Sequence, residues 1–246
     1  MEVVVASSSI DAGIGCWDLQ SGNEQLRYKS CSSPAHGLVS VGGRFFASSQ
    51  LRDSSSSGFV LYWSFHKPQH EVKSFPAEPI KPLVSNSEGN YLIGGGASGD
   101  IYVWEADNLR DDNFVDAGGS FLLALLGILA GPKLRIRNAA SVIVPVLTGR
   151  LLKRWHAHYR AVTCLTLSDD ESLLISGAED GCVRVWSLFM MFDDVRREES
   201  RHPYVHSFLE HTLRVTDVKS GHGGSNAVII SASEDRTCKV RSAFHV

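Results

Sequence analysis

An all-β fold is predicted by two features of this chain: strand-like runs that close on a tryptophan, and the regular spacing of those tryptophans. The runs are SSGFVLYW at 56–63, ASGDIYVW at 97–104, AEDGCVRVW at 178–186, and SEDRTCKVR at 233–241, in which Arg241 replaces the tryptophan. Trp17, Trp63 and Trp104 are 46 and 41 residues apart. A strand-rich unit of roughly 40–45 residues is typical of a WD-type β-propeller blade. The sequence therefore predicts an incomplete WD-repeat β-propeller of about four blades.

The composition is that of a folded chain from a reducing compartment. Its 246 residues are 43% hydrophobic and 21% charged, which is enough to bury a core. A net charge of −3 gives no general attraction to nucleic acid or anionic membrane. The five cysteines form no CxxC pair and are odd in number, so no disulfide framework is expected. The start MEVVVASSSIDAG lacks the features of a signal peptide, so we expect no secretion.

The repeat spacing doubles once along the chain. Trp104 and Trp186 are 82 residues apart, and residues 105–147 contain no strand-Trp unit. After Trp17 the hairpin turn reaches Gly22 in five residues, whereas the equivalent turn after Trp104 reaches Gly149 in 45. A non-homologous insert of about forty residues, near 106–146, in the turn after an outer strand explains the excess. The predicted division is 1–105 for the N-terminal blades, 106–147 for the insert and 148–246 for two further WD blades, the last truncated.

Residues 151–188 form the best-preserved unit, and they predict a buried polar network. Three strand-like runs, AVTCLTL, SLLISGA and CVRVWSL, are separated by the turn sequences SDDES and AEDG. The histidine, serine, aspartate and tryptophan positions of a WD blade are occupied by His158, Ser176, Asp180 and Trp186. We expect Asp180 to accept a hydrogen bond from His158, and Ser176 to link His158 to the indole N–H of Trp186. Buried polar groups need such mutual partners.

A second network is predicted from His211, Ser231 and Asp235, with Arg241 where its tryptophan belongs. The histidine and aspartate are 24 residues apart here and 22 apart in the preceding unit. A catalytic Ser-His-Asp site uses the same residue types. The chain has no exposed nucleophile turn such as GxSxG, so we interpret both sets as structural and predict no enzyme.

Two further motifs suggest ligand sites. GGGASG at 94–99 fits the dinucleotide pattern GxGxxG, but the strand-like IYVW follows it where a helix is needed, so we predict a turn. His156 and His158 have no further ligands at suitable spacing, so no metal or cofactor is expected. Residues 190–208 form a long link between the two late blades. Its charged stretch DDVRREESRH, at 193–202, is predicted to be an exposed loop, a common place for partner contacts.

Several joined motifs resemble one family of WD-repeat proteins. They are RWHAHYRAVTCL, LLISGAEDGCVRVWSL, EHTLRVTDV, AVIISASEDRTCKV, EVVVASSSIDAGIGCWDLQSG and GGGASGDIYVWE. They are similar to the Root Initiation Defective family, the WD-repeat subunit of the Rix complex, over about 1–105 and 148–240. That family's propeller has more blades than this chain supplies, which leaves open sheet edges and apolar blade faces. We therefore expect an incomplete gene product.

The resemblance implies a non-catalytic scaffold in pre-ribosomal RNA processing and large ribosomal subunit assembly, with a link to DNA replication licensing. The implied partners are proteins of a pre-ribosome assembly complex, namely scaffold subunits and a remodelling ATPase, with no small-molecule substrate and no membrane. The implied location is the nucleus and nucleolus, with the cytoplasm as a further site. The acidic balance disfavours direct RNA contact without deciding it. The alternative is a WD-repeat adaptor in another complex, such as a ubiquitin ligase.

Overall fold

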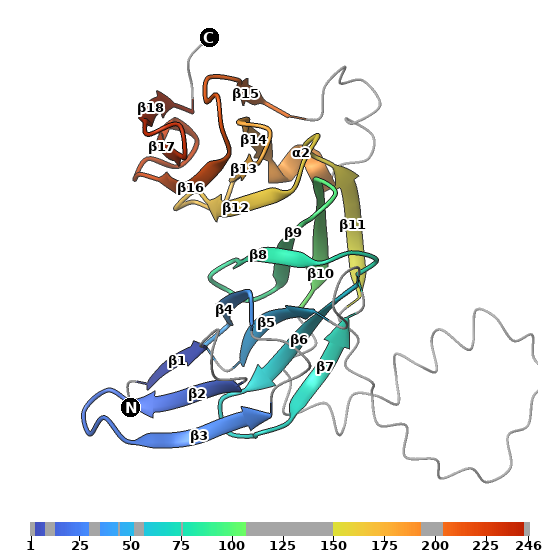
Figure 1. The fold of residues 1–246 in the computed structure, drawn as a ribbon, viewed down its shortest axis with the longest axis vertical. Coiled ribbons are helices and arrows are strands. Elements are labelled where there is room, and N and C mark those ends of the chain that lie inside the picture. The colour runs from blue at the N-terminus through green and yellow to red at the C-terminus, as the bar shows by residue number, and fades with distance from the viewer. Residues whose placement is uncertain are drawn as a thin grey trace, which may run out of the picture.

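The computed structural model describes residues 3–7, 13–29, 35–43, 45–51, 57–74, 76–106, 150–192 and 204–243. In these residues the regular structure is β-strand, apart from the short helix α2 (Leu188–Phe192) and a 3-10 turn at Gly224–Asn226. The strands form five antiparallel sheets that follow one another along the longest axis of the molecule (Figure 1). The all-β prediction is confirmed.

Each sheet is a meander in which strands pair in chain order. The first contains β1 (Val3–Ser7), β2 (Gly13–Asp18) and β3 (Glu24–Lys29). The second contains β4 (Gly37–Val41), β5 (Phe45–Leu51), β6 (Gly58–Ser64) and β7 (His70–Ser74). The third contains β8 (Ile80–Ser85), β9 (Tyr91–Gly96), β10 (Asp100–Glu105) and β11 (Leu151–His156). The fourth contains β12 (Val162–Leu167), β13 (Leu173–Ala178), β14 (Val183–Ser187) and β15 (His206–Phe208), and the fifth contains β16 (Val215–Ser220), β17 (Val228–Ser233) and β18 (Cys238–Ser242).

The described residues form one sheet more than the predicted count of about four. The count from sequence rested on four runs that close on tryptophan or on Arg241. The additional sheet is β1–β3, where Trp17 of β2 pairs with Val4 of β1. The first and fifth sheets have three strands each, and the other three have four.

Apolar side chains hold successive sheets together face to face. Because side chains alternate along a strand, each sheet presents one face to the sheet before it and the other to the sheet after it. Each fully buried tryptophan lies on the face toward the preceding sheet. Trp63 shares an apolar cluster with Ile14 and Tyr28 of the first sheet, Trp104 with Val60 and Tyr62 of the second, and Trp186 with Ile101 and Val103 of the third. The stack of sheets therefore has a direction, from the first to the fifth.

Strands β10 and β11 are hydrogen-bonded neighbours, although about 45 residues of chain separate them. The N–H of Glu105 donates to the carbonyl oxygen of Arg150 at 2.9 Å. The intervening chain therefore leaves and re-enters at the same end of one hairpin. The predicted insert at 106–146 lies, apart from Ala106, outside the described residues. The division of the chain at residues 105 and 147 stays a prediction.

The link at 190–208 begins and ends in regular structure, whereas the charged stretch at 193–202, for which an exposed loop is predicted, lies outside the described residues, so that prediction remains open. The helix α2 continues to Phe192, and β15 adds a fourth strand to its sheet by pairing with β14. Residues 193–203 lie outside the described part of the chain. In the ranges that are described, no helix is long and apolar enough to cross a membrane.

Candidate functional site

The fourth sheet brings His158, Ser176, Asp180 and Trp186 together. Trp186 Nε1 donates to Ser176 Oγ at 2.9 Å, and His158 Nε2 lies 2.7 Å from the same oxygen. His158 Nδ1 lies 3.4 Å from Asp180 Oδ1, within ion-pair distance but without the geometry of a hydrogen bond. Asp180 accepts hydrogen bonds from the backbone N–H groups of Tyr159 and Cys182, at 3.1 and 3.0 Å. The aspartate therefore ties the turn before β14 to the loop that carries the histidine.

Strand register explains how these residues meet. Leu174 of β13 is the cross-strand partner of Trp186 in β14. Ser176 lies two residues further along β13, on the same face, so its hydroxyl faces the indole N–H. The turn between the strands contains Gly181 with φ 78°, and a Cβ there would lie 2.4 Å from the carbonyl oxygen of His211, in the loop that leads into the fifth sheet. The glycine thus permits close contact between the two sheets.

Burial determines how this network is protonated. Removal of His158 from water lowers the pKa of its imidazole, and Asp180 only partly offsets this effect. Burial raises the pKa of the Asp180 carboxyl, but His158 and the two backbone amides outweigh it, so that pKa lies well below its usual value. At neutral pH a neutral imidazole therefore faces a carboxylate. The carboxylate of Asp180 favours the imidazole proton on Nδ1, which leaves Nε2 free to accept the hydroxyl proton of Ser176.

The fifth sheet repeats the histidine, serine and aspartate without the indole. His211 Nδ1 lies 2.9 Å from Asp235 Oδ2, and its Nε2 lies 2.9 Å from Ser231 Oγ. Thr237 Oγ1 donates to Asp235 at 2.6 Å. The hydrogen bond from Thr237, with smaller contributions from His211 and backbone amides, holds the pKa of Asp235 well below its usual value, although burial acts in the opposite direction.

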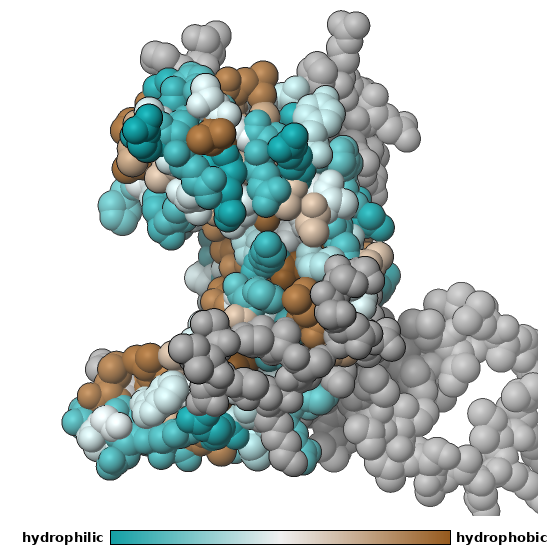
Figure 2. Space-filling view, in the orientation of Figure 1, coloured by the Kyte–Doolittle hydropathy of each residue, from teal (hydrophilic) through white to brown (hydrophobic). Residues whose placement is uncertain are grey.

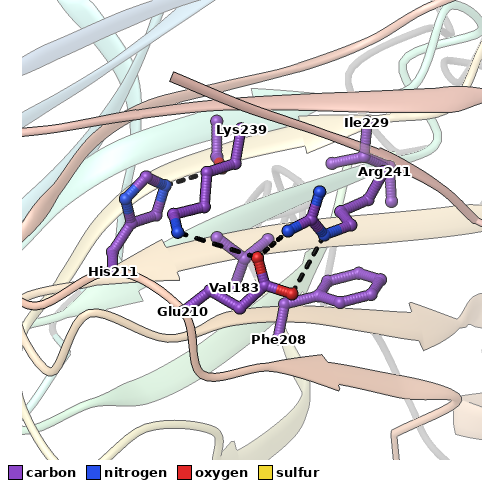
Figure 3. A pocket seen from close by; sticks show the side chains of 8 residues that line it. Val183, Phe208, Glu210, His211, Ile229, Lys239 and Arg241 are labelled. Carbon is purple, nitrogen blue, oxygen red and sulfur yellow. Dashed lines mark hydrogen bonds and ion pairs between the residues drawn. The ribbon is translucent and has the colours of Figure 1, made fainter. Parts of the chain in front are cut away.

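Arg241 occupies the position of the missing tryptophan. Its guanidinium binds the carboxylate of Glu210, which also pairs with Lys239 (Figure 3). Beside Ser231 there remains a small hollow that is open to solvent. It is lined by Val183, Phe208, Glu210, His211, Ile229, Ser231, Lys239 and Arg241. The last network is therefore complete from Asp235 to Ser231 and ends at a partly open space.

The second sheet contains a serine–tryptophan pair that the sequence reasoning missed. Trp63 Nε1 donates to Ser48 Oγ at 2.8 Å. Ser48 follows Phe46, the cross-strand partner of Trp63, by two residues, just as Ser176 follows Leu174. A serine two residues after the cross-strand partner of a tryptophan is the signal that could have found this pair.

The third sheet has a different polar network, centred on Glu78. Its carboxylate accepts hydrogen bonds from Ser98 Oγ at 2.7 Å, from Tyr102 OH at 2.8 Å and from the N–H of Ser98. Ser98 stands where Asp180 and Asp235 stand in later repeats, six residues before the tryptophan position. Glu78 lies in the loop before β8, and no spacing pattern marks it.

The serines of these networks are poorly placed for catalysis. Ser176 and Ser231 are buried between sheets, and the hydroxyl of Ser176 is already engaged by Trp186 and His158. A nucleophile must instead reach a substrate. The GGGASG motif spans the end of β9 and the turn to β10, so the predicted turn between strands is confirmed. His156 is exposed and lies 2.9 Å from Asp100, and within the described ranges no group of three His, Cys, Asp or Glu side chains could hold a metal.

Comparison with known proteins agrees with this geometry. Residues 149–187 and 203–242 match the family WD domain, G-beta repeat. The chain is 52% identical over 243 residues to Protein ROOT INITIATION DEFECTIVE 3 of Arabidopsis thaliana, a match that covers 98% of this chain and 46% of that protein. It is 28% identical over 245 residues to human WD repeat-containing protein 18, covering 98% of this chain and 45% of that protein.

A more distant relative comes from a fungus. The chain is 27% identical over 202 residues to Pre-rRNA-processing protein IPI3 of Mycosarcoma maydis, covering 76% of this chain and 34% of that protein. The chain thus spans less than half the length of each of these three relatives. The resemblance found in the sequence is confirmed: residues 149–187 and 203–242 of this chain are WD repeats, and they lie in an all-β structure consistent with an incomplete β-propeller.

Proposed function

We propose that this chain is a non-catalytic scaffold in pre-ribosomal RNA processing and assembly of the large ribosomal subunit. The observation that carries the proposal is 52% identity over 98% of the chain to a WD-repeat relative, together with similarity to a protein named for pre-rRNA processing. The polar networks support a structural role, because their serines are buried within rigid sheets. The proposed partners are proteins of a pre-ribosome assembly complex, including scaffold subunits and a remodelling ATPase.

The loops that carry the network histidines offer a surface for such partners. Tyr159 follows His158 and is 80% exposed, and Leu213 lies two residues after His211 and is also exposed. Asp180 and Asp235 fix these loops by accepting the N–H groups of Tyr159 and Thr212. The guanidinium of Arg184 lies 5.7 Å from the ring centre of Tyr159. Exposed apolar side chains on rigidly held loops are typical of protein-binding surfaces.

Co-sedimentation tests this function. The tagged chain is expressed in cells, and extracts of the nucleus and nucleolus are separated on a sucrose gradient. We expect the chain to co-sediment there with large-subunit precursors. Substitution of Tyr159→Ala and Leu213→Ala should reduce that association without lowering the melting temperature. Leu19→Ala is the matched control, since Leu19 is also exposed but lies in the turn after β2. Association with a ubiquitin ligase and absence from pre-ribosomes would contradict the proposal.

A further link to DNA replication licensing belongs to the same proposal. It rests on the family resemblance alone, and it is separable by experiment. Depletion of the protein should delay loading of replication factors on chromatin before ribosome numbers fall. A delay that appears only after ribosomes are depleted would remove the licensing role and leave the scaffold role intact.

A further inference from the structure

Tyr159 is an exposed aromatic residue on a loop that is held in place between the third and fourth sheets. The residue is 80% exposed, whereas its backbone N–H donates to Asp180 at 3.1 Å. Its ring makes a T-shaped contact with His156, with 6.4 Å between the ring centres, and also contacts the guanidinium of Arg184. An aromatic side chain that is ordered before binding loses little conformational entropy when a partner covers it. Tyr159 is therefore placed to be the centre of an interface.

Arg184, on β14, keeps this loop ordered from the fourth sheet. Its Nε donates to Ser207 Oγ at 3.4 Å, and its Nη1 donates to the carbonyl oxygen of Ala157, the residue before the network histidine. The guanidinium also lies 5.2 Å from the ring centre of Tyr204. One guanidinium thus contacts two tyrosine rings and the backbone that leads to Tyr159, so a partner meets a surface that is already formed.

Arginine and histidine side chains beside Tyr159 are exposed, whereas the carboxylate that binds two of them is not. The side chains of Arg154 and His156, on β11, are 48% and 61% exposed. Asp100 binds both of them, with 2.9 Å between its Oδ1 and His156 Nδ1, and only 10% of its own side chain is exposed. Arg160, which follows Tyr159, is exposed as well. On this side of the ring, a partner therefore meets hydrogen-bond donors rather than carboxylates.

Arg160 has the most to gain from a partner. Within the described ranges, its guanidinium takes part in no ion pair and no hydrogen bond. Asp180, which fixes the loop, is 9% exposed at its side chain and already accepts two backbone N–H groups. A carboxylate brought by a partner would form charge-assisted hydrogen bonds with Arg160, and these are roughly twice as strong as neutral ones. We call Arg154, His156, Tyr159 and Arg160 the Tyr159 surface.

From this arrangement we infer that the Tyr159 surface binds an acidic peptide segment of a protein partner. An apolar side chain of the segment covers the ring of Tyr159, and carboxylates on either side of it pair with Arg154 and Arg160. The inference rests on the proposed scaffold role, because it gives the chemistry of one partner of that scaffold. Figure 2 shows a mostly hydrophilic face over the fourth and fifth sheets, with hydrophobic residues scattered on it, which is the mixed character of a non-obligate protein interface.

A nucleic acid fits this surface less well than a peptide does. Its backbone is a polyanion that responds to the net charge within about 8 Å at physiological salt. Three arginines and four carboxylates lie on or beside these loops, namely Arg154, Arg160, Arg184, Glu78, Asp100, Glu179 and Asp180. Together they carry no net positive charge. The carboxylate of a docked peptide depends instead on the exposed guanidinium in direct contact with it, so the structure favours a protein as the partner.

Selection from a random peptide library displayed on phage tests the inference without a known ligand. The library is panned on the unchanged chain at physiological salt and, in parallel, on the Tyr159→Ala variant. We expect the peptides recovered on the unchanged chain to be enriched in aspartate and glutamate around an apolar residue, and few of them to be recovered on Tyr159→Ala. Recovery of no peptide, of peptides without an excess of carboxylates, or of the same peptides on both proteins would overturn the inference.

Charge reversal tests the contact itself, with fluorescence polarisation of one recovered peptide as the readout. Arg160→Glu should weaken binding by about tenfold or more, because it brings like charges together. Lys81→Glu is the matched control, because Lys81 is also exposed but lies on β8, at the opposite edge of the third sheet from β11. Both substitutions change the net charge equally, so an equal loss from the two would show a general charge effect and overturn the inference. Melting temperatures establish that each variant is folded.

A second peptide, with lysine in place of each glutamate and aspartate, completes the charge reversal. It should bind Arg160→Glu more tightly than it binds the unchanged chain, and the opposite order would contradict a direct contact. A labelled oligouridine measured at the same salt concentration should bind more weakly than the acidic peptide. Tighter binding of the oligouridine would assign the surface to RNA and overturn the inference.

A cross-linking experiment keeps the inference testable if a variant does not fold. The recovered acidic peptide carries a benzophenone and is irradiated with the unchanged chain, and mass spectrometry locates the attachment. We expect attachment within residues 154–160, and attachment only at other parts of the chain would count against the Tyr159 surface.

The ribosomal proposal and this inference can fail separately. A chain that selects acidic peptides but is absent from pre-ribosomes would remove the ribosomal role and keep the Tyr159 surface. A chain that co-sediments with pre-ribosomes but selects no acidic peptides would keep the scaffold role and remove this inference.

Discussion

Arg241→Trp should stabilise the protein by completing the network of the fifth sheet. An indole at this position would replace the Arg241 side chain against Val183, Phe208 and Ile229, and its N–H would face Ser231 as that of Trp186 faces Ser176. An aromatic side chain buries about 150–250 Å², worth roughly 4–6 kcal/mol at about 25 cal/mol per Å². This is an upper bound, because the hollow is open on one side and the stem of Arg241 already covers part of it.

Two smaller effects set the net result. The hydrogen bond to Ser231 adds about 1 kcal/mol. Loss of the half-exposed Arg241–Glu210 ion pair removes about 1 kcal/mol or less. We therefore expect a net gain of about 1–2 kcal/mol, or about 2–4 °C in melting temperature for each kcal/mol in a chain of this size. The mirror change, Trp186→Arg in the fourth sheet, should cost about 3–5 kcal/mol.

Urea and thermal unfolding, followed by near-UV circular dichroism at one fixed protein concentration, measure the effect. Arg241→Leu is the control, because it removes the ion pair and adds apolar surface without a hydrogen-bond donor. Combining Arg241→Trp with Ser231→Ala gives a double-mutant cycle for the indole–hydroxyl pair. If Arg241→Trp is no more stable than Arg241→Leu, or if the cycle shows no coupling, the reasoning from the fourth sheet to the fifth is refuted.

Three further changes test the networks and the turns. Asp180→Ala should lower the unfolding free energy by roughly 1–3 kcal/mol, because it removes the acceptor of two backbone N–H groups and the carboxylate that faces the buried His158. In urea denaturation, a loss no larger than that of the exposed Leu19→Ala would contradict this. Stability should fall as the pH drops through about 6.5, because the pKa of His158 is lowered in the folded chain and the unfolded chain therefore binds more protons there. The depressed pKa of Asp180 adds a second loss of stability below about 3.8. Melting temperatures measured across this pH range check both steps, and His158→Gln should flatten the upper one. Gly181→Ala should lower the melting temperature more than Gly22→Ala does. Both glycines have a positive φ, but only at Gly181 would a Cβ collide with backbone, namely the carbonyl oxygen of His211. Equal losses of melting temperature would contradict a role of Gly181 in sheet-to-sheet contact.

The sequence predicted what depends on short spacings and missed what depends on register and on distant loops. His158, Ser176, Asp180 and Trp186 were chosen from positions within one repeat, and hairpin geometry brings such positions together whatever the neighbouring sheet does. Ser48 was missed because its link to Trp63 depends on pairing across β5 and β6. Glu78 precedes its own sheet and reaches Ser98 and Tyr102 through a loop, which no periodicity reveals.

The same limit explains the error in the sheet count and the difference in histidine–aspartate distance between the two networks. The β1–β3 sheet depends on a pairing between β1 and β2, and the count from sequence, which used four later runs, did not include it. His158 Nδ1 lies 3.4 Å from Asp180, whereas His211 Nδ1 lies 2.9 Å from Asp235, although the two pairs have nearly the same spacing in sequence. The composition of the chain carries no information about differences of this size in interatomic distance.

The pairing of β10 with β11 makes the end of this hairpin tolerant of added sequence. Closing a loop costs free energy that grows only with the logarithm of its length, by about 0.6 kcal/mol for each doubling. This cost is offset by the hydrogen bonds between Asp100–Glu105 and Leu151–His156, and by the packing of Trp155 in the cluster shared with the fourth sheet. Evolution can therefore lengthen, exchange or remove the segment between these strands while the register of the propeller sheets remains unchanged, and a reporter domain placed there would inherit the same freedom.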